Sequence, residues 1–78
     1  MEEAFVLINC DLGKEEQIIQ DLKHMNNVKE VQATFGVYDI IAKIESETKS
    51  ELRNMIRSKI LMIKPIHSVL LLQSTSSW

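Results

Sequence analysis

Four features are scarce in this 78-residue sequence, which contains one cysteine, one proline, two glycines and only 5% aromatic residues. Because Cys10 is the single cysteine, no internal disulfide can form, which agrees with a reducing, cytoplasmic environment. The acidic N-terminus lacks the basic region of a signal peptide, and no apolar run reaches the roughly 18 residues of a membrane span. We therefore expect a cytoplasmic protein without a membrane segment.

Charge and aromatic content argue against direct contact with nucleic acid. The net charge is −2, and the basic residues are scattered along the chain. A nucleic-acid-binding domain needs a basic patch, and an RNA-binding sheet needs exposed aromatic side chains. We expect neither here.

Apolar residues are plentiful for a chain of this size, at 45% of the sequence. A domain this short buries only roughly 60% of the surface that its unfolded chain exposes. We therefore expect a single domain over residues 1–78 in which another subunit covers part of the apolar surface. Residues 74–78 are polar apart from the last and are expected to form a flexible tail.

Six segments carry the hydrophobic periodicity of strands or helices. We predict strands at 4–10, 28–35, 38–44 and 66–73, and helices at 14–25 and 49–63. This βαββαβ order is the ferredoxin-like motif, an α+β fold with a four-stranded antiparallel sheet. Right-handed crossovers place both helices on one face of the sheet. The other face is left bare, and a symmetric dimer is the simplest way to cover it.

Residue choices at the second helix support its predicted position. Thr48 is followed three residues later by Glu51, which is the spacing of a capping box at a helix N-terminus. Pro65 ends the helix, because proline cannot continue the hydrogen-bond ladder. The last strand then contains the uninterrupted apolar run 69–72, which needs cover on both faces.

Gly36 lies between two β-favouring runs and predicts a tight hairpin. Asp39 follows closely, although aspartate is a poor strand former. Its carboxylate either accepts hydrogen bonds from the turn's own N–H groups or joins those groups in holding a small polar ligand. The first interpretation is the more common use of aspartate in turns.

The segment Gly36-Val-Tyr-Asp39, the apolar strand after it, Glu51-Leu52 opening a helix and Ile60-Leu-Met-Ile63 before a closing strand together resemble the effector (RAM) domain of Lrp/AsnC regulators. The resemblance covers about residues 4–73. It implies sheet-to-sheet dimers of the dimeric α+β barrel type, which assemble into rings of eight or ten subunits, octamers or decamers. It also implies that amino acids or related small molecules bind between neighbouring dimers.

Carried over to this sequence, the resemblance implies a ligand-binding loop at the glycine-containing turn. Its residues are Thr34, Phe35, Gly36, Val37, Tyr38 and Asp39. Family members usually carry a DNA-binding helix-turn-helix as well, which this sequence does not contain. The implied role is a stand-alone effector domain, without cofactor, that senses a small molecule and modulates full-length Lrp/AsnC regulators.

Three departures from the family pattern favour either a ligand more apolar than a standard amino acid or no ligand at all. Val37 stands where the family often has a polar residue. The turn before the last strand reads Lys64-Pro65-Ile66 in place of proline-glycine-valine, and the run 69–72 lacks the usual polar groups.

Two other functions remain open. Cys10, His24 and His67 are candidate metal ligands, but they share no local motif, so a metal site would have to form across subunits. A dimeric α+β barrel enzyme would need a catalytic group in a cavity between sheets. The sequence offers no catalytic triad, and its aspartates are predicted to lie far apart. We therefore expect a non-enzymatic protein.

Overall fold

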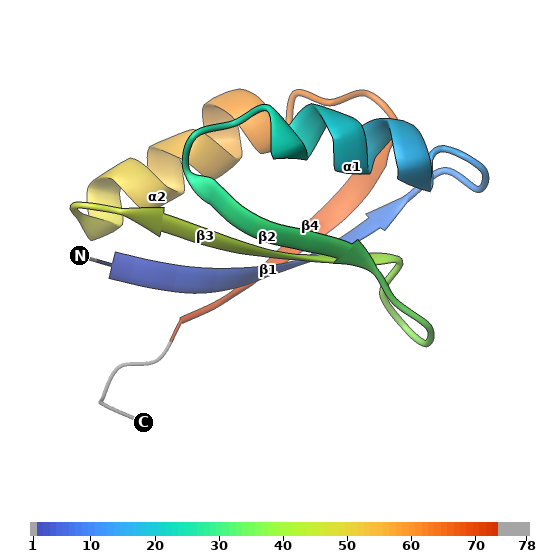
Figure 1. Cartoon of the computed structure of the whole chain (residues 1–78), viewed down its shortest axis with the longest axis horizontal. Coiled ribbons are helices and arrows are strands. Elements are labelled where there is room, and N and C mark those ends of the chain that lie inside the picture. Colours follow the sequence, from blue (N-terminus) through green and yellow to red (C-terminus); the bar gives the residue numbers. More distant parts are fainter. Residues whose placement is uncertain (1, 74–78) are drawn as a thin grey trace.

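The computed structural model describes residues 2–73, which form one antiparallel sheet with strand order β2-β3-β1-β4 and two helices on one face (Figure 1). The elements are β1 (Glu2–Cys10), α1 (Glu15–Lys23), β2 (Val28–Ala33), β3 (Ile40–Ser46), α2 (Lys49–Met55), the π-helical turn η1 (Ile56–Ile60) and β4 (Ile66–Leu72). The predicted ferredoxin-like fold is confirmed. The tail predicted at 74–78 lies outside the described residues.

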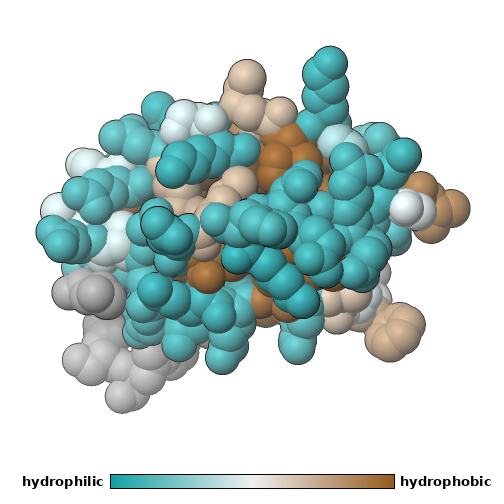
Figure 2. Space-filling model, turned by 45° about the horizontal axis from the view of Figure 1, so that its top comes forward, coloured by the Kyte–Doolittle hydropathy of each residue, from teal (hydrophilic) through white to brown (hydrophobic). Residues whose placement is uncertain are grey.

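The core fills the space between the sheet and the helices. In β1 and β3 every second side chain points toward the helices, as the alternation of a strand requires. Fully or almost fully buried are Val6, Ile8, Ile40, Ala42 and Ile44 from these strands and Ile18, Leu22, Leu52 and Ile60 from the helical layer. The side that carries the helices presents mainly hydrophilic residues to solvent (Figure 2).

The opposite face of the sheet carries a cluster of apolar side chains that no element within residues 2–73 covers. Its members stand in register on β1, β3 and β4, and we call them the open-face cluster: Phe5, Leu7, Ile41, Leu70 and Leu72. Next to the cluster, Lys43 and Glu3 form an ion pair at 3.2 Å. The apolar run predicted for the last strand is therefore divided between the core and this open face.

The N-terminus of α2 is capped as predicted, whereas its end differs from the prediction. Thr48 accepts a hydrogen bond from the Glu51 N–H at 3.1 Å. The helix was predicted to continue to residue 63, but it ends in η1, where the Leu61 N–H donates to the Ile56 carbonyl at 2.8 Å. This bond spans five residues and widens the last turn, so the chain leaves the helix before the proline is reached.

The prediction of a tight hairpin at Gly36 is wrong in length. β2 ends at Ala33 and β3 begins at Ile40, so the six residues 34–39 form a loop instead of extending the strands. Phe35 was expected on the apolar face of a strand, but it lies in this loop and is fully exposed.

Candidate functional site

The loop Thr34–Asp39 is closed at its base by two hydrogen bonds. The Thr34 N–H donates to the Asp39 carbonyl at 2.9 Å, and the Thr34 hydroxyl donates to the Tyr38 carbonyl at 2.6 Å. Gly36, at the tip, has a φ angle of +117°, which side-chain-bearing residues rarely adopt. The six candidate ligand-binding residues therefore form one compact projecting structure.

The tip of the loop presents both apolar and polar groups to its surroundings. The side chains of Phe35 and Val37 are among the most exposed large apolar groups of the described chain. Across residues 2–73, no acceptor receives a hydrogen bond from the N–H groups of residues 35–38. Consecutive unpaired N–H groups can bind an anionic group such as a carboxylate.

Asp39 lies at the exit of the loop and contacts β1 through both backbone and side chain. Its N–H donates to the Ile8 carbonyl at 2.9 Å, and its Oδ2 accepts a hydrogen bond from the Cys10 N–H at 2.9 Å. The prediction that the turn's own N–H groups would bind this carboxylate is therefore wrong. The donor comes from a strand 29 positions away in the sequence, so local sequence reasoning could not identify it.

The thiol of Cys10 is surrounded by acidic groups. Burial raises its pKa, and the negative charges of Asp39, Glu15 and Asp11 raise it further, because a thiolate is disfavoured beside other anions. Asp11 and Asp39 thus both lie near Cys10, contrary to the expectation that the aspartates are far apart.

The candidate metal ligands are placed separately. His24 caps the C-terminus of α1, where its Nδ1 lies 2.6 Å from the Gln20 carbonyl, and Nε2 of His67 pairs with Oδ1 of Asp11. Within residues 2–73, no three His, Cys, Asp or Glu side chains are grouped to hold a metal ion. The His67–Asp11 pair was missed, although it could be anticipated from the antiparallel topology, which sets the end of β1 beside the start of β4.

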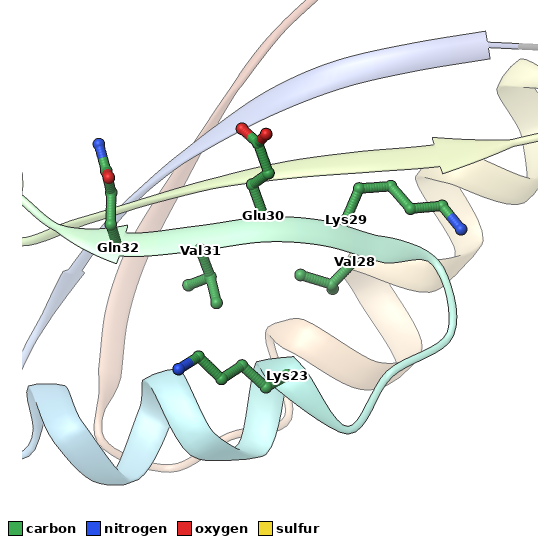
Figure 3. A pocket seen from close by; sticks show the side chains of 6 residues that line it. All are labelled: Lys23, Val28, Lys29, Glu30, Val31 and Gln32. Carbon is green, nitrogen blue, oxygen red and sulfur yellow. The ribbon is translucent and has the colours of Figure 1, made fainter.

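Two of the surface hollows formed by residues 2–73 lie away from the loop. The larger, of about 500 Å³, is formed between α1 and the edge strand β2 and is lined by Lys23, Val28, Lys29, Glu30, Val31 and Gln32. Figure 3 shows the two valines directed toward α1, while Glu30 and Gln32 point to the other side of the strand. The second hollow lies beside Asn27 and Glu45. Neither of these two hollows includes a candidate ligand-binding residue.

The sheet order β2-β3-β1-β4 and the two helices on one face together define a ferredoxin-like α+β domain. The chain belongs to the Lrp/AsnC family, because residues 3–76 match the family described as the Lrp/AsnC ligand binding domain. Within residues 2–73, no helix is both long and apolar enough to cross a membrane.

Individual relatives agree with this assignment. The HTH-type transcriptional regulator FL11 of Pyrococcus horikoshii is 32% identical over 53 residues, which is 68% of this chain and 35% of the regulator. The chain therefore spans about a third of that protein's length. The crystal structure of FFRP-DM1 is 32% identical with a TM-score of 0.92, and covers 95% of this chain and 99% of its own.

Two further solved structures show the same fold. The hypothetical protein PHS023 of Pyrococcus horikoshii is 31% identical, covers 99% of this chain and 93% of its own, and has a TM-score of 0.92. E. coli AsnC is 22% identical with a TM-score of 0.89, and the match covers 96% of this chain but 51% of AsnC.

Proposed function

We propose that this chain senses a small molecule, an amino acid or a close relative, through the loop Thr34–Asp39, and that it does not catalyse a reaction. The observation that carries this proposal is the set of N–H groups at residues 35–38, which have no acceptor among residues 2–73 and lie next to two exposed apolar side chains. The N–H groups can bind the ligand's carboxylate, and Phe35 and Val37 favour an apolar side chain on the ligand.

We further propose that two copies pair through the open-face cluster. The five side chains form one continuous apolar surface across three strands, and such a surface on a soluble domain favours association. Pairing two identical faces gives a twofold-symmetric dimer, and contacts between loop regions of neighbouring dimers then produce a ring.

The signal would arise by linkage between ligand binding and assembly. A ligand bound between dimers stabilises the state in which it makes more contacts, so its differential affinity shifts the assembly equilibrium. The regulatory output would follow from association with full-length Lrp/AsnC regulators, which provide the DNA-binding domain.

Native mass spectrometry with and without a pool of the twenty amino acids tests this proposal. We expect a ring of dimers that retains a small adduct whose mass identifies the ligand. A protein that retains no adduct at millimolar concentrations of the pool contradicts the sensing function. A monomer without the pool contradicts the proposed dimer.

A further inference from the structure

Asp39 replaces a backbone group at the point where the β1–β3 ladder ends. Ile8 lies opposite Ile40, so continuing the pairing by two residues would set Cys10 opposite Tyr38. In the structure the Tyr38 carbonyl accepts a hydrogen bond from the Thr34 hydroxyl at the base of the loop. The Cys10 N–H donates to Oδ2 of Asp39 at 2.9 Å.

The other neighbour of β1 is irregular at the same position. Asn9 lies opposite Ser68, but Cys10 lies opposite Ile66, so His67 is skipped and the β1–β4 ladder contains a bulge. A bulge disrupts the regular hydrogen bonds of the strands on which it lies. The contact from Asp39 therefore adds a hydrogen bond at the end of β1, where the pairing with β4 is irregular.

All three polar groups of Asp39 are engaged within the chain. Its N–H binds the Ile8 carbonyl, its own carbonyl accepts from the Thr34 N–H, and its carboxylate binds the Cys10 N–H. The N–H groups of the loop tip, in contrast, have no acceptor within the described residues. The loop thus contains a fixed base and a tip that is free to bind.

We propose that Asp39 is a positioning residue, whose carboxylate holds the loop Thr34–Asp39 against the end of β1 through the Cys10 N–H. It acts on the ligand through the N–H groups of the tip and does not contact the ligand's ammonium group. The ligand part of this proposal rests on the sensing function above, whereas the contact with Cys10 does not.

Amide hydrogen exchange of the purified protein tests the contact without any ligand. We expect Asp39→Ala to raise the exchange rate of the Cys10 amide by about tenfold or more, because a hydrogen bond to a charged acceptor is lost. Asp39→Asn keeps an acceptor oxygen and should stay within about threefold of the unmodified protein. Asp21→Ala, which removes an exposed carboxylate from α1, is the matched control and should change nothing. Unchanged protection of the Cys10 amide in Asp39→Ala overturns the proposal.

Adduct retention from the amino-acid pool tests the effect on the ligand. We expect the pool concentration for half-maximal occupancy to rise about tenfold or more in Asp39→Ala and by less than about threefold in Asp39→Asn. A direct contact with the ligand's ammonium predicts equal damage in both variants, because the amide has no negative charge, and that result overturns the proposal.

The two measurements separate failure of this proposal from failure of the sensing function. If the unmodified protein retains no adduct, sensing is contradicted and hydrogen exchange alone decides the role of Asp39. If Asp39→Ala does not fold, Asp39→Asn still separates the two roles. If Asp39→Asn retains the adduct at nearly the occupancy of the unmodified protein, the positioning role is supported. If Asp39→Asn loses affinity for the adduct by about tenfold or more, the positioning role is contradicted.

Discussion

Cys10 and Asp39 lie 29 positions apart in the sequence, yet the N–H of one donates to the carboxylate of the other at 2.9 Å. The same carboxylate is the first of three negative charges that raise the pKa of the Cys10 thiol after burial itself. Asp39 therefore affects both the hydrogen bonding at the end of β1 and the ionisation of the Cys10 thiol. Both properties can be measured at one residue.

The thiol provides the first prediction. Because the thiolate is the reactive form, a raised pKa lowers the reactivity of Cys10 at pH 8. We expect iodoacetamide to alkylate the folded protein roughly fivefold or more slowly than the urea-unfolded chain. The rate should rise with pH, with a midpoint above that of the unfolded thiol. The free energy of unfolding should fall as the pH rises from the pKa of the unfolded thiol to that of the folded thiol, because the unfolded state loses its thiol proton at lower pH than the folded state.

Replacing a nearby carboxylate supplies the control for this prediction. Glu15→Gln removes one of the three negative charges that raise the pKa of the thiol and leaves the Asp39 contact in place, so it should lower the pH midpoint of alkylation. Asp21→Asn, which is not among the groups that shift the thiol, should leave it unchanged. Equal alkylation rates in the folded and unfolded chains would refute the electrostatic explanation.

At the scale of single elements, the two helices begin in different ways. The Thr48 side chain caps α2, whereas Lys14 precedes α1 without any side-chain cap. The stability of α2 therefore depends on a contact that can be removed without touching the core. An N-cap threonine contributes about 1 kcal/mol to stability.

Thr48→Ala is expected to lower the free energy of unfolding by about 1 kcal/mol, because the Glu51 N–H loses its acceptor. In a domain of this size the melting temperature should fall by about 4–8 °C. Thr48→Ser keeps the hydroxyl and should retain most of the stability. Urea denaturation with circular dichroism measures both variants, and equal losses in the two would show that the hydroxyl is not what matters.

The elements were predictable from sequence to the extent that local patterns determine them. Alternation identified the strands, and the Thr48 cap gave the start of α2 correctly. The loop after β2 was predicted too short. A tight hairpin would pair its residues as strand residues, whereas here Thr34 donates to the Asp39 carbonyl and Asp39 also binds β1. Asp39's donor and the His67–Asp11 pair depend on contacts between distant segments, which periodicity cannot reveal.

At the scale of the whole molecule, the elements that the structure describes cover one face of the sheet and leave the other open. The helices bury one side of the sheet, and the open-face cluster faces away from them. The proposed dimer follows from this geometry, because a second copy presents the same apolar surface and can cover the first. The candidate loop lies at one end of this sheet (Figure 1), so assembly would also decide what faces the loop.

Leu70 lies within the open-face cluster opposite Leu7, with an exposed fraction of 43%. Leu70→Glu places a charge on each copy at the proposed interface, where burial without a partner is costly. We expect this variant to sediment as a folded monomer while the unmodified protein sediments as a dimer or larger assembly. Leu61 offers a matched control, because it follows η1 on the other side of the molecule and has a similar exposed fraction of 47%. Leu61→Glu should retain the unmodified mass in analytical ultracentrifugation. If Leu70→Glu also retains that mass, the open face is not the dimer interface, and the loop must then face a partner reached through another surface.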